Sequence, residues 1–290
     1  MFTTAEQRAI DQLSSESGRL AVVAADQRTK LVEALQAAGL DSGMDFMRAF
    51  KLDLVSALAP AAPAMLLDPE IALPHVTDAG ALPAHTGLLV SLERSGSRRT
   101  PEGLRRAQLL PGVGADGVRR LGGTGAKLLL RLRADREDAD GANAAVLREA
   151  VADCAAHHLL LVVELLIYRL DDEDEGGYEA ARGDLIREAA LLAESCGARY
   201  LKLEYPGDER ACRRVTDALS VPWALLSAGV DHETFTVQLR AALAAGAAGF
   251  IAGRSIWKES VAMRGEERRA FLAGKARRRL DQLLAIAGKM

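Results

Sequence analysis

Short apolar runs alternate with amphipathic stretches along most of the chain. About eight runs are each short enough for one strand, namely Leu20–Ala25, Ala64–Leu67, Gly87–Leu92, Leu128–Leu132, Leu159–Tyr168, Tyr200–Tyr205, Trp223–Ser227 and Gly249–Ala252. Apolar residues recur at helical spacing between them, in Arg28–Ala38, Met44–Leu58, Ala142–Ala156, Tyr178–Cys196 and His232–Ala245. Continuous apolar strands that alternate with helices are typical of a buried parallel sheet. The pattern therefore predicts an α/β fold.

The number of strand–helix repeats favours a closed barrel over an open sheet. About eight repeats within 290 residues fit a single (β/α)8 TIM barrel. A doubly wound open sheet usually has a glycine fingerprint after its first strand, whereas here Asp26-Gln27-Arg28 follows that strand. The glycine-rich Gly122–Gly125 precedes a strand, so we interpret it as a turn. We expect one barrel domain over residues 1–290, with a helical extension over about residues 1–18 and a closing helix over about residues 262–290.

Two segments depart from the alternating pattern. Arg94–Gly117 is rich in glycine, proline and arginine, which predicts a long loop with part of a helix. Asp171–Gly177 is an acidic run that ends in two glycines. We interpret the acidic run as a solvated loop at the barrel rim, and a metal site there is the less favoured alternative.

Composition excludes several classes of function. The formal net charge is −3 and aromatic residues make up only 4%, so neither a nucleic acid nor an anionic membrane is expected as a partner. No apolar run reaches the ~18 residues of a membrane span, and residues 1–17 lack an export signal. The three cysteines, Cys154, Cys196 and Cys212, form no CxxC pair, which argues against a disulfide framework or a thiolate metal site. We expect a cytoplasmic protein.

A lysine and a glutamate in predicted strands are candidates for catalysis. Barrel active sites lie at the carboxyl ends of the strands, and side chains alternate along each strand. In Tyr200–Tyr205 this alternation turns Leu201 and Leu203 toward the helices and Lys202 and Glu204 toward the interior. Burial favours the neutral form of an amine, which is the form that attacks a carbonyl group. Lys202 is therefore a candidate nucleophile, although a structural ion pair fits the same position.

Two further charged residues lie on neighbouring predicted strands. Glu164 interrupts the apolar run Leu160–Ile167, and a buried carboxylate needs a partner. If the fifth and sixth strands are adjacent, Glu164 reaches Lys202 and could transfer protons during C–C cleavage, and a structural ion pair is equally consistent. Lys127 opens the preceding strand, on the predicted face of Arg131 and Arg133. It could keep Lys202 unprotonated by repulsion or bind an anion.

Polar groups also follow the first and the last two strands. Asp26, Gln27 and Arg28 end the first strand, a suitable place for groups that bind substrate hydroxyls. Ser227-Ala228-Gly229 ends the seventh strand and Gly253-Arg254 the eighth. Glycine lets backbone N–H groups approach an oxyanion, an arginine adds a bidentate cation, and barrels often bind phosphate at these two strands. We predict a phosphate site at Ser227, Gly229, Gly253 and Arg254.

Eight motifs, taken in order, resemble one family of enzymes. They are AADQR (Ala24–Arg28), AFKLDLVSALAP (Ala49–Pro60), LLDPE (Leu66–Glu70), GAKLLL (Gly125–Leu130), VVELL (Val162–Leu166), YLKLEYP (Tyr200–Pro206), PWALLSAGVDHETF (Pro222–Phe235) and GFIAGRSIW (Gly249–Trp257). Over roughly Leu20 to Val261 the chain resembles the class I aldolases that include tagatose 1,6-bisphosphate aldolase and sulfofructose 1-phosphate aldolase.

The resemblance implies a role for each candidate residue. Lys202 matches the lysine that forms the Schiff base, Glu164 its acid/base glutamate and Lys127 a polar partner in the site. Asp26 and Gln27 match contacts to substrate hydroxyls, and the predicted phosphate site matches the group that holds the ketose C1 phosphate. The implied reaction cleaves a ketohexose phosphate into dihydroxyacetone phosphate and an aldehyde. It needs no metal or other cofactor because the iminium takes up the electrons.

The resemblance leaves the aldehyde end of the substrate open. LERSG (Leu92–Gly96), DPE and Tyr168 are similar to tagatose-type enzymes, whereas Arg133 before Ala134-Asp135 is similar to the sulfofructose enzymes. A second anion site with Arg133 would hold a phosphate or a sulfonate. Tyr168–Arg199 is shorter than the corresponding tagatose-type segment. A barrel that binds a sugar phosphate without catalysis is an alternative of another class, and self-association into a homo-oligomer is possible for a barrel of this size.

Overall fold

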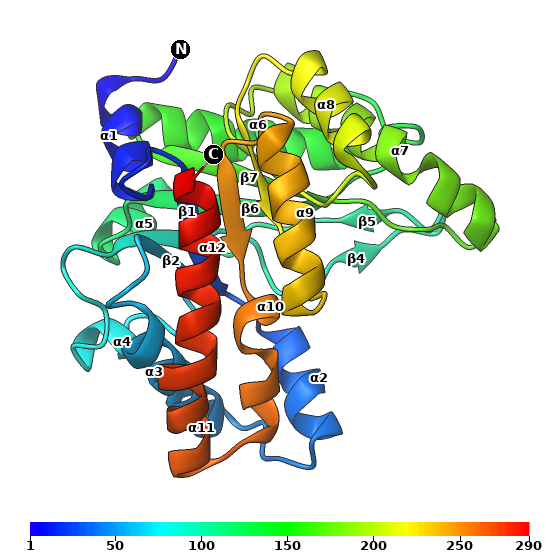
Figure 1. Cartoon of the computed structure of the whole chain (residues 1–290). Coiled ribbons are helices and arrows are strands. Elements are labelled where there is room, and N and C mark those ends of the chain that lie inside the picture. Colours follow the sequence, from blue (N-terminus) through cyan, green and yellow to red (C-terminus); the bar gives the residue numbers. More distant parts are fainter. Residues whose placement is uncertain (290) are drawn as a thin grey trace.

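Eight parallel strands close into a barrel in the computed structural model, which describes residues 1–289 (Figure 1). Around the barrel the strands are β1 (Leu20–Ala25), β10 (Gly249–Ala252), β9 (Trp223–Leu226), β8 (Leu201–Leu203), β7 (Leu160–Leu166), β6 (Gly125–Arg131), β3 (Gly87–Ser91) and β2 (Ala64–Leu67). Every apolar run that we predicted as a strand overlaps one of these eight. The predicted (β/α)8 barrel is confirmed.

Helices surround the barrel (Figure 1). They are α1 (Thr4–Gln12), α2 (Thr29–Ala37), α3 (Met44–Leu58), α4 (His75–Asp78), α5 (Ala115–Arg120), α6 (Ala142–Ala156), α7 (Glu175–Ser195), α8 (Glu209–Ala218), α9 (His232–Ala244), α10 (Arg254–Trp257), the 3-10 helix η1 (Lys258–Ala262), α11 (Gly265–Phe271), the π-helix η2 (Leu272–Ala276) and α12 (Arg277–Lys289). Among the described residues, none of these helices is long and apolar enough to span a membrane.

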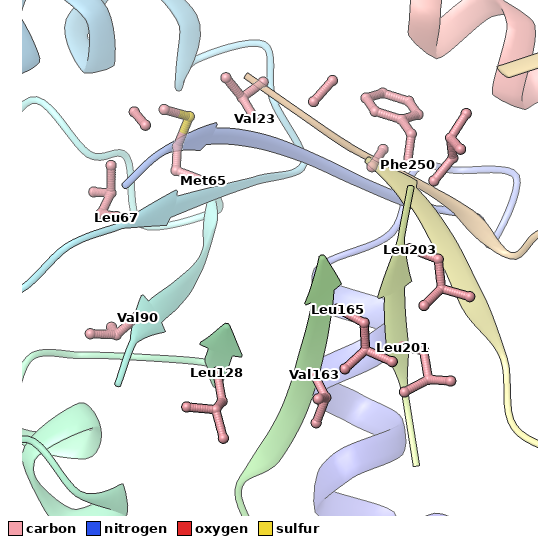
Figure 2. Packing of buried hydrophobic residues seen from close by; sticks show 14 of the residues in the cluster. Val23, Met65, Leu67, Val90, Leu128, Val163, Leu165, Leu201, Leu203 and Phe250 are labelled. Atoms are coloured by element: carbon pink, nitrogen blue, oxygen red, sulfur yellow. The ribbon is translucent and has the colours of Figure 1, made fainter. Parts of the chain in front are cut away.

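Alternation along the strands divides the buried residues into two clusters. The larger cluster fills the space between the strands and the helices, and Figure 2 shows members such as Val23, Leu128 and Leu201 on the outer side of the strand ring. The smaller cluster lies inside the barrel and includes Val22 and Leu66. Helix α1 contributes apolar side chains to this inner cluster, so it closes the amino end of the barrel. Charged side chains inside the barrel can therefore gather only toward its carboxyl end.

Two segments differ from their prediction in detail. Within Arg94–Gly117, β4 (Arg98–Arg99) and β5 (Arg105–Arg106) pair as an antiparallel hairpin that packs beside β6 (Figure 1). The prediction of a loop with part of a helix was right about α5 and missed this hairpin. In the acidic run, the Asp174 side chain accepts a hydrogen bond from the backbone N–H of Gly177 and caps α7, so the end of that run is helical instead of a loop.

Candidate active site

The predicted catalytic residues meet at the carboxyl end of the barrel. Strands β7 and β8 pair so that Glu164 lies opposite Lys202. The Glu164 Oε2 atom is 2.8 Å from the Lys202 Nζ atom and also 2.8 Å from the Lys127 Nζ atom. Lys202 is only 4% exposed, and the leucines on either side of it belong to the outer cluster. The structure thus gives Glu164 and Lys202 the neighbouring positions that strand alternation predicted.

Lys127 lies within a group of three carboxylates. Its ammonium group contacts Asp26 Oδ2 at 2.9 Å and Glu93 Oε1 at 2.9 Å, in addition to Glu164. Burial alone would lower the pKa of Lys127, but the three carboxylates outweigh burial and raise that pKa well above its ordinary value. An ammonium group has three N–H donors, and each has a carboxylate here. Lys127 is therefore placed to hold the three carboxylates in position, and it has no donor left for an anion.

Charges alternate through this buried network. Burial would raise the pKa of Glu164, but the ammonium groups of Lys127 and Lys202 outweigh burial and lower that pKa. The pKa of Asp26 is held well below its usual range in the same way, against the effect of burial, by the same two lysines. Both carboxyl groups are therefore ionised in the resting site. Asp26, Lys127, Glu164 and Lys202 form a sequence of opposite charges.

Three charged residues next to this network were not among the predicted site residues. Glu93 is buried, and it accepts hydrogen bonds from Lys127, from the Leu129 backbone N–H at 3.0 Å and from Arg28. Lys51 donates to the carbonyl oxygen of Ala25 at 2.8 Å and pairs with buried Asp68. One signal could have indicated Glu93 and Asp68, because each follows a buried apolar run closely, as Asp26 does.

The residues after β1 line the cavity in front of Lys202. The cavity measures about 410 Å³, and Asp26, Gln27 and Arg28 all line it. The Gln27 Oε1 atom is buried and has no hydrogen-bond partner among residues 1–289, so it can accept a bond from a substrate hydroxyl. The Arg28 guanidinium pairs with Glu70 and donates to the carbonyl oxygen of Glu93 at 2.8 Å. These bonds fix the orientation of Arg28.

The predicted phosphate residues line a second cavity, of about 170 Å³, that also reaches Lys202 and Glu164. A Cβ atom at Gly253 would lie 2.6 Å from the carbonyl oxygen of Ala24, so only glycine fits this close approach. Gly229 has a φ of +85°, and a Cβ atom there would lie 3.0 Å from the Arg254 Cζ atom. The two glycines therefore let Arg254 and the backbone N–H groups approach the same space. Ser227 lines this cavity too.

Glu204 also lines the second cavity, as its predicted inward orientation requires. Its carboxylate accepts hydrogen bonds from the Ile167 backbone N–H and from Arg182, each at 2.9 Å. Burial raises its pKa, although Arg182 opposes that effect. Glu204 therefore connects the end of β7 to α7 beside the predicted phosphate site.

Comparison with known proteins identifies the family. Residues 20–259 match the family model described as DeoC/LacD family aldolase. The chain belongs to this aldolase family. The enzyme is 28% identical over 286 residues to tagatose 1,6-diphosphate aldolase 2 of Enterococcus faecalis, a match that covers 90% of this chain and 85% of that protein. It is also 28% identical over 284 residues to tagatose 1,6-diphosphate aldolase of Listeria monocytogenes, covering 89% and 83% of the two chains.

Solved structures of aldolases share the fold. A Schiff base-forming fructose-1,6-bisphosphate aldolase superposes with a TM-score of 0.64 at 16% identity, covering 96% of this chain and 99% of the other. The fructose-bisphosphate aldolase of Slackia heliotrinireducens gives a TM-score of 0.62 at 18% identity, covering 99% and 91%. At these identities the likeness shows a shared barrel. The predicted membership of the aldolase family rests on the family model and the sequence relatives.

The structure does not bring Arg133 into the active site of this aldolase. Arg133 is 1% exposed, and it lines neither of the two cavities. Its guanidinium forms paired hydrogen bonds with Asp135 and with Glu173, and it also donates to the carbonyl oxygen of Tyr168 at 2.9 Å. These bonds use all five N–H donors of the guanidinium. The predicted contact between Arg133 and the aldehyde end of the substrate is therefore not supported.

We expect Arg133→Met to weaken folding instead of substrate binding. The substitution leaves Asp135 and Glu173 with only their longer contacts to Arg136, at 3.5 and 3.8 Å, which costs about 2–3 kcal/mol in the free energy of unfolding. Hydrogen bonds from Arg133 lower the pKa of Glu173 to about 2. Because that pKa lies below the unfolded value, the stabilisation is complete above about pH 4.5 and is lost as the pH falls toward 2. Urea unfolding should therefore show a smaller difference between wild type and variant at pH 3 than at pH 7.

The control for this substitution is Arg136→Met, because the Arg136 side chain is 43% exposed. We expect this control to change the free energy of unfolding by about 0–1 kcal/mol. A raised KM for the ketose phosphate in Arg133→Met, with unchanged stability, would restore the substrate role of Arg133.

Proposed function

We propose that this aldolase cleaves a ketohexose 1-phosphate or 1,6-bisphosphate through a Schiff base on Lys202 and releases dihydroxyacetone phosphate. One observation carries the proposal: the Lys202 Nζ atom is buried and lies 2.8 Å from the Glu164 carboxylate, at the junction of two cavities. A nucleophilic amine with an adjacent carboxylate is the arrangement that iminium chemistry requires. The other buried lysine in the cavity lining, Lys127, contacts three carboxylates that raise its pKa and keep it protonated, so Lys202 is the better candidate nucleophile.

Schiff-base formation requires proton transfers that Glu164 is placed to perform. Lys202 first gives its ammonium proton to Glu164, 2.8 Å away, and the resulting neutral amine adds to the ketose C2 carbonyl to form a carbinolamine. The carbinolamine then loses its hydroxyl group as water, with the proton from Glu164, to give an iminium. At the carbinolamine the nitrogen carries no charge, so one of the two cations that lower the pKa of Glu164 is absent. Glu164 then holds a proton more readily and can pass it to the departing hydroxyl group. Lys127 remains beside Glu164 throughout.

Cleavage uses the same carboxylate in the opposite direction. Glu164 accepts the proton of the C4 hydroxyl, the C3–C4 bond breaks, and its electron pair moves through C2 to the iminium nitrogen. The aldehyde leaves and an enamine remains on Lys202. Glu164 returns its proton to C3, and water then hydrolyses the iminium to release dihydroxyacetone phosphate and the free amine. Water and protons balance over the cycle, and the iminium supplies the electron sink.

The second cavity fits the phosphate on C1. Arg254 supplies a guanidinium, and Gly229 and Gly253 leave room for an oxyanion to approach the backbone. The cavity opens directly beside Lys202, so a phosphate held there places the adjacent C2 carbonyl near the amine. In the first cavity, Gln27 and Asp26 are positioned for the hydroxyl groups of the sugar.

The two sequence relatives are named as tagatose 1,6-diphosphate aldolases, which supports a ketohexose 1,6-bisphosphate of the tagatose type as the substrate. Sulfofructose 1-phosphate is the second candidate, because it would undergo the same steps and release sulfolactaldehyde. The two substrates differ in the group on C6, a phosphate or a sulfonate, and in the configuration of the C4 hydroxyl. Both differences lie away from the C1 phosphate, so the residues that line the first cavity decide between them.

Borohydride trapping tests the proposal directly. We expect intact-protein mass spectrometry to show a stable adduct after the enzyme is treated with dihydroxyacetone phosphate and borohydride, and peptide mapping to place it on Lys202. Dihydroxyacetone without phosphate is the matched control, and it should give an adduct only at much higher concentration because it lacks the anion that Arg254 binds. Binding of dihydroxyacetone phosphate without any adduct would contradict the proposal and favour a barrel that only binds sugar phosphates.

A further inference from the structure

Two partly buried arginines on neighbouring segments, Arg105 and Arg131, line the first cavity without a carboxylate partner. Arg105 belongs to the β4–β5 hairpin and Arg131 ends β6, and both line the 410 Å³ cavity together with Lys202 and Glu164. Both are partly buried. Among residues 1–289 no carboxylate forms an ion pair with either guanidinium, whereas Arg28 and Arg133 nearby are each paired twice. Two further arginines of the lining also form no ion pair among residues 1–289: Arg94 is exposed, and Arg254 also lines the second cavity, where it is assigned to the C1 phosphate. Arg105 and Arg131 are therefore the partly buried cations that remain for another anion.

The fold holds these two arginines beside each other. The buried side-chain amide of Asn143 donates to the carbonyl oxygen of Arg105 at 2.9 Å and to that of Arg131 at 3.1 Å. Its own carbonyl oxygen accepts the backbone N–H of Ala107 at 3.0 Å, which secures the hairpin. Tyr168 adds a third contact, because its hydroxyl group accepts the Arg105 backbone N–H at 2.9 Å. These hydrogen bonds therefore hold side by side the two backbone segments that carry Arg105 and Arg131.

Holding two like charges together costs free energy unless an anion lies between them. Burial lowers the pKa of Arg131 and the Arg105 guanidinium lowers it further, because the carboxylates of Glu164, Glu93 and Glu204 oppose the shift without outweighing it. The Arg105 guanidinium lies 5.4 Å from the centre of the Tyr168 ring, which fixes its position over the aromatic face. Two guanidinium groups in one cavity lining, neither of which donates a hydrogen bond among residues 1–289, match an oxyanion with several acceptor oxygens.

We propose that Arg105 and Arg131 bind the terminal oxyanion, a phosphate or a sulfonate, at the aldehyde end of the ketose. This inference rests on the proposed function, because the two cavities meet at Lys202 and the second one takes the C1 phosphate. A substrate that carries an anion at each end then places its middle carbons beside Lys202 and Glu164. The arginine pair selects substrates with a charged tail, a role that the paired guanidinium of Arg133 does not fill.

Substrate comparison measures this selection. The ratio to determine is kcat/KM for a ketohexose 1,6-bisphosphate, or for sulfofructose 1-phosphate, divided by kcat/KM for the ketohexose 1-phosphate with a neutral C6 hydroxyl. We expect Arg105→Met and Arg131→Met each to lower that ratio about tenfold, and the double variant about 100-fold. The wild-type enzyme gives one ratio for the phosphate tail and one for the sulfonate tail, and the larger of the two identifies the tail that the arginines prefer. An unchanged ratio in the double variant would overturn the proposal.

The matched control is Arg106→Met, because Arg106 is next to Arg105 in the hairpin but is exposed and does not line the cavity. Its ratio should stay within about twofold of wild type.

If the double variant fails to fold, the wild-type enzyme still decides the question in the synthetic direction. With dihydroxyacetone phosphate as donor, it should use glyceraldehyde 3-phosphate at least about 100-fold more efficiently than glyceraldehyde, and equal use of the two aldehydes would contradict the arginine subsite.

The arginine subsite and the Schiff-base mechanism are tested by different measurements, so one can be wrong while the other holds. Trapping of dihydroxyacetone phosphate by borohydride does not involve the tail of the ketose, so it reports on Lys202 alone. An adduct on Lys202 together with no preference for charged tails would overturn the arginine subsite and leave the Schiff base intact. No adduct in the wild-type enzyme would overturn the mechanism itself.

Discussion

Replacement of Lys202 by methionine abolishes turnover of the ketose phosphate, with an expected fall in kcat of about 10⁴-fold or more. Methionine keeps most of the apolar stem that packs inside the barrel and removes the amine that attacks the carbonyl group. Without the iminium no group in the site can take up the electron pair of the C3–C4 bond. A coupled assay of dihydroxyacetone phosphate release, followed over a range of enzyme concentrations, measures the residual rate.

The fold should survive this substitution, because Lys127 still neutralises Glu164 at 2.8 Å when Lys202 is gone. Circular dichroism should show an unchanged spectrum and a modest shift in Tm. Lys275→Met serves as the control, since Lys275 lies in η2 with a side chain that is 56% exposed. This control should turn over normally. A folded Lys202→Met enzyme that retains a tenth of the wild-type kcat would show that another amine forms the Schiff base, or that none does.

The barrel was predictable because its strands are buried on both faces. Each strand is a continuous apolar run, and the helical stretches Met44–Leu58 and Ala142–Ala156 have the predicted bounds as α3 and α6. Helix α8 was not singled out because charged residues dominate its sequence and it buries only Ala211, Cys212 and Val215. The β4–β5 hairpin was missed for a different reason. Strands of two residues are too short for any periodicity, and backbone contacts from Asn143 and Tyr168 hold their position.

The active site was predictable where a regular strand carries the side chain. Alternation along β8 and the pairing of β7 with β8 are sufficient to bring Glu164 to Lys202. The same rule failed at Arg133, because β6 ends at Arg131 and alternation no longer applies two residues later. Beyond the strand, Asp135 and Glu173 determine where Arg133 points. Glu93 reaches Lys127, and the Lys51–Asp68 pair lies beside the network, only through contacts between distant segments, which a local pattern does not encode.

Replacement of Glu164 by glutamine should lower kcat about 10³-fold, the typical effect of removing a positioned acid/base. Glutamine has the shape of glutamate but neither accepts nor returns a proton, so every proton transfer between the carbinolamine and the enamine slows. The expected change in KM is small by comparison, because the C1 phosphate still binds in the second cavity through Arg254. Steady-state kinetics with single-turnover trapping separates slow chemistry from weak binding.

Glu93→Gln is the matched control that gives the Glu164 result its meaning. Both carboxylates contact Lys127, at 2.9 Å and 2.8 Å, but only Glu164 also contacts Lys202. If Glu164 acted merely as a partner for Lys127, the two substitutions would lower kcat to a similar extent. If it transfers protons at the reacting carbons, Glu164→Gln should cost at least about tenfold more than Glu93→Gln. Equal losses in kcat would show that both carboxylates act only as partners of Lys127. The group that transfers protons would then be another residue of the cavity lining, and Asp26 and Glu204 would be the first candidates.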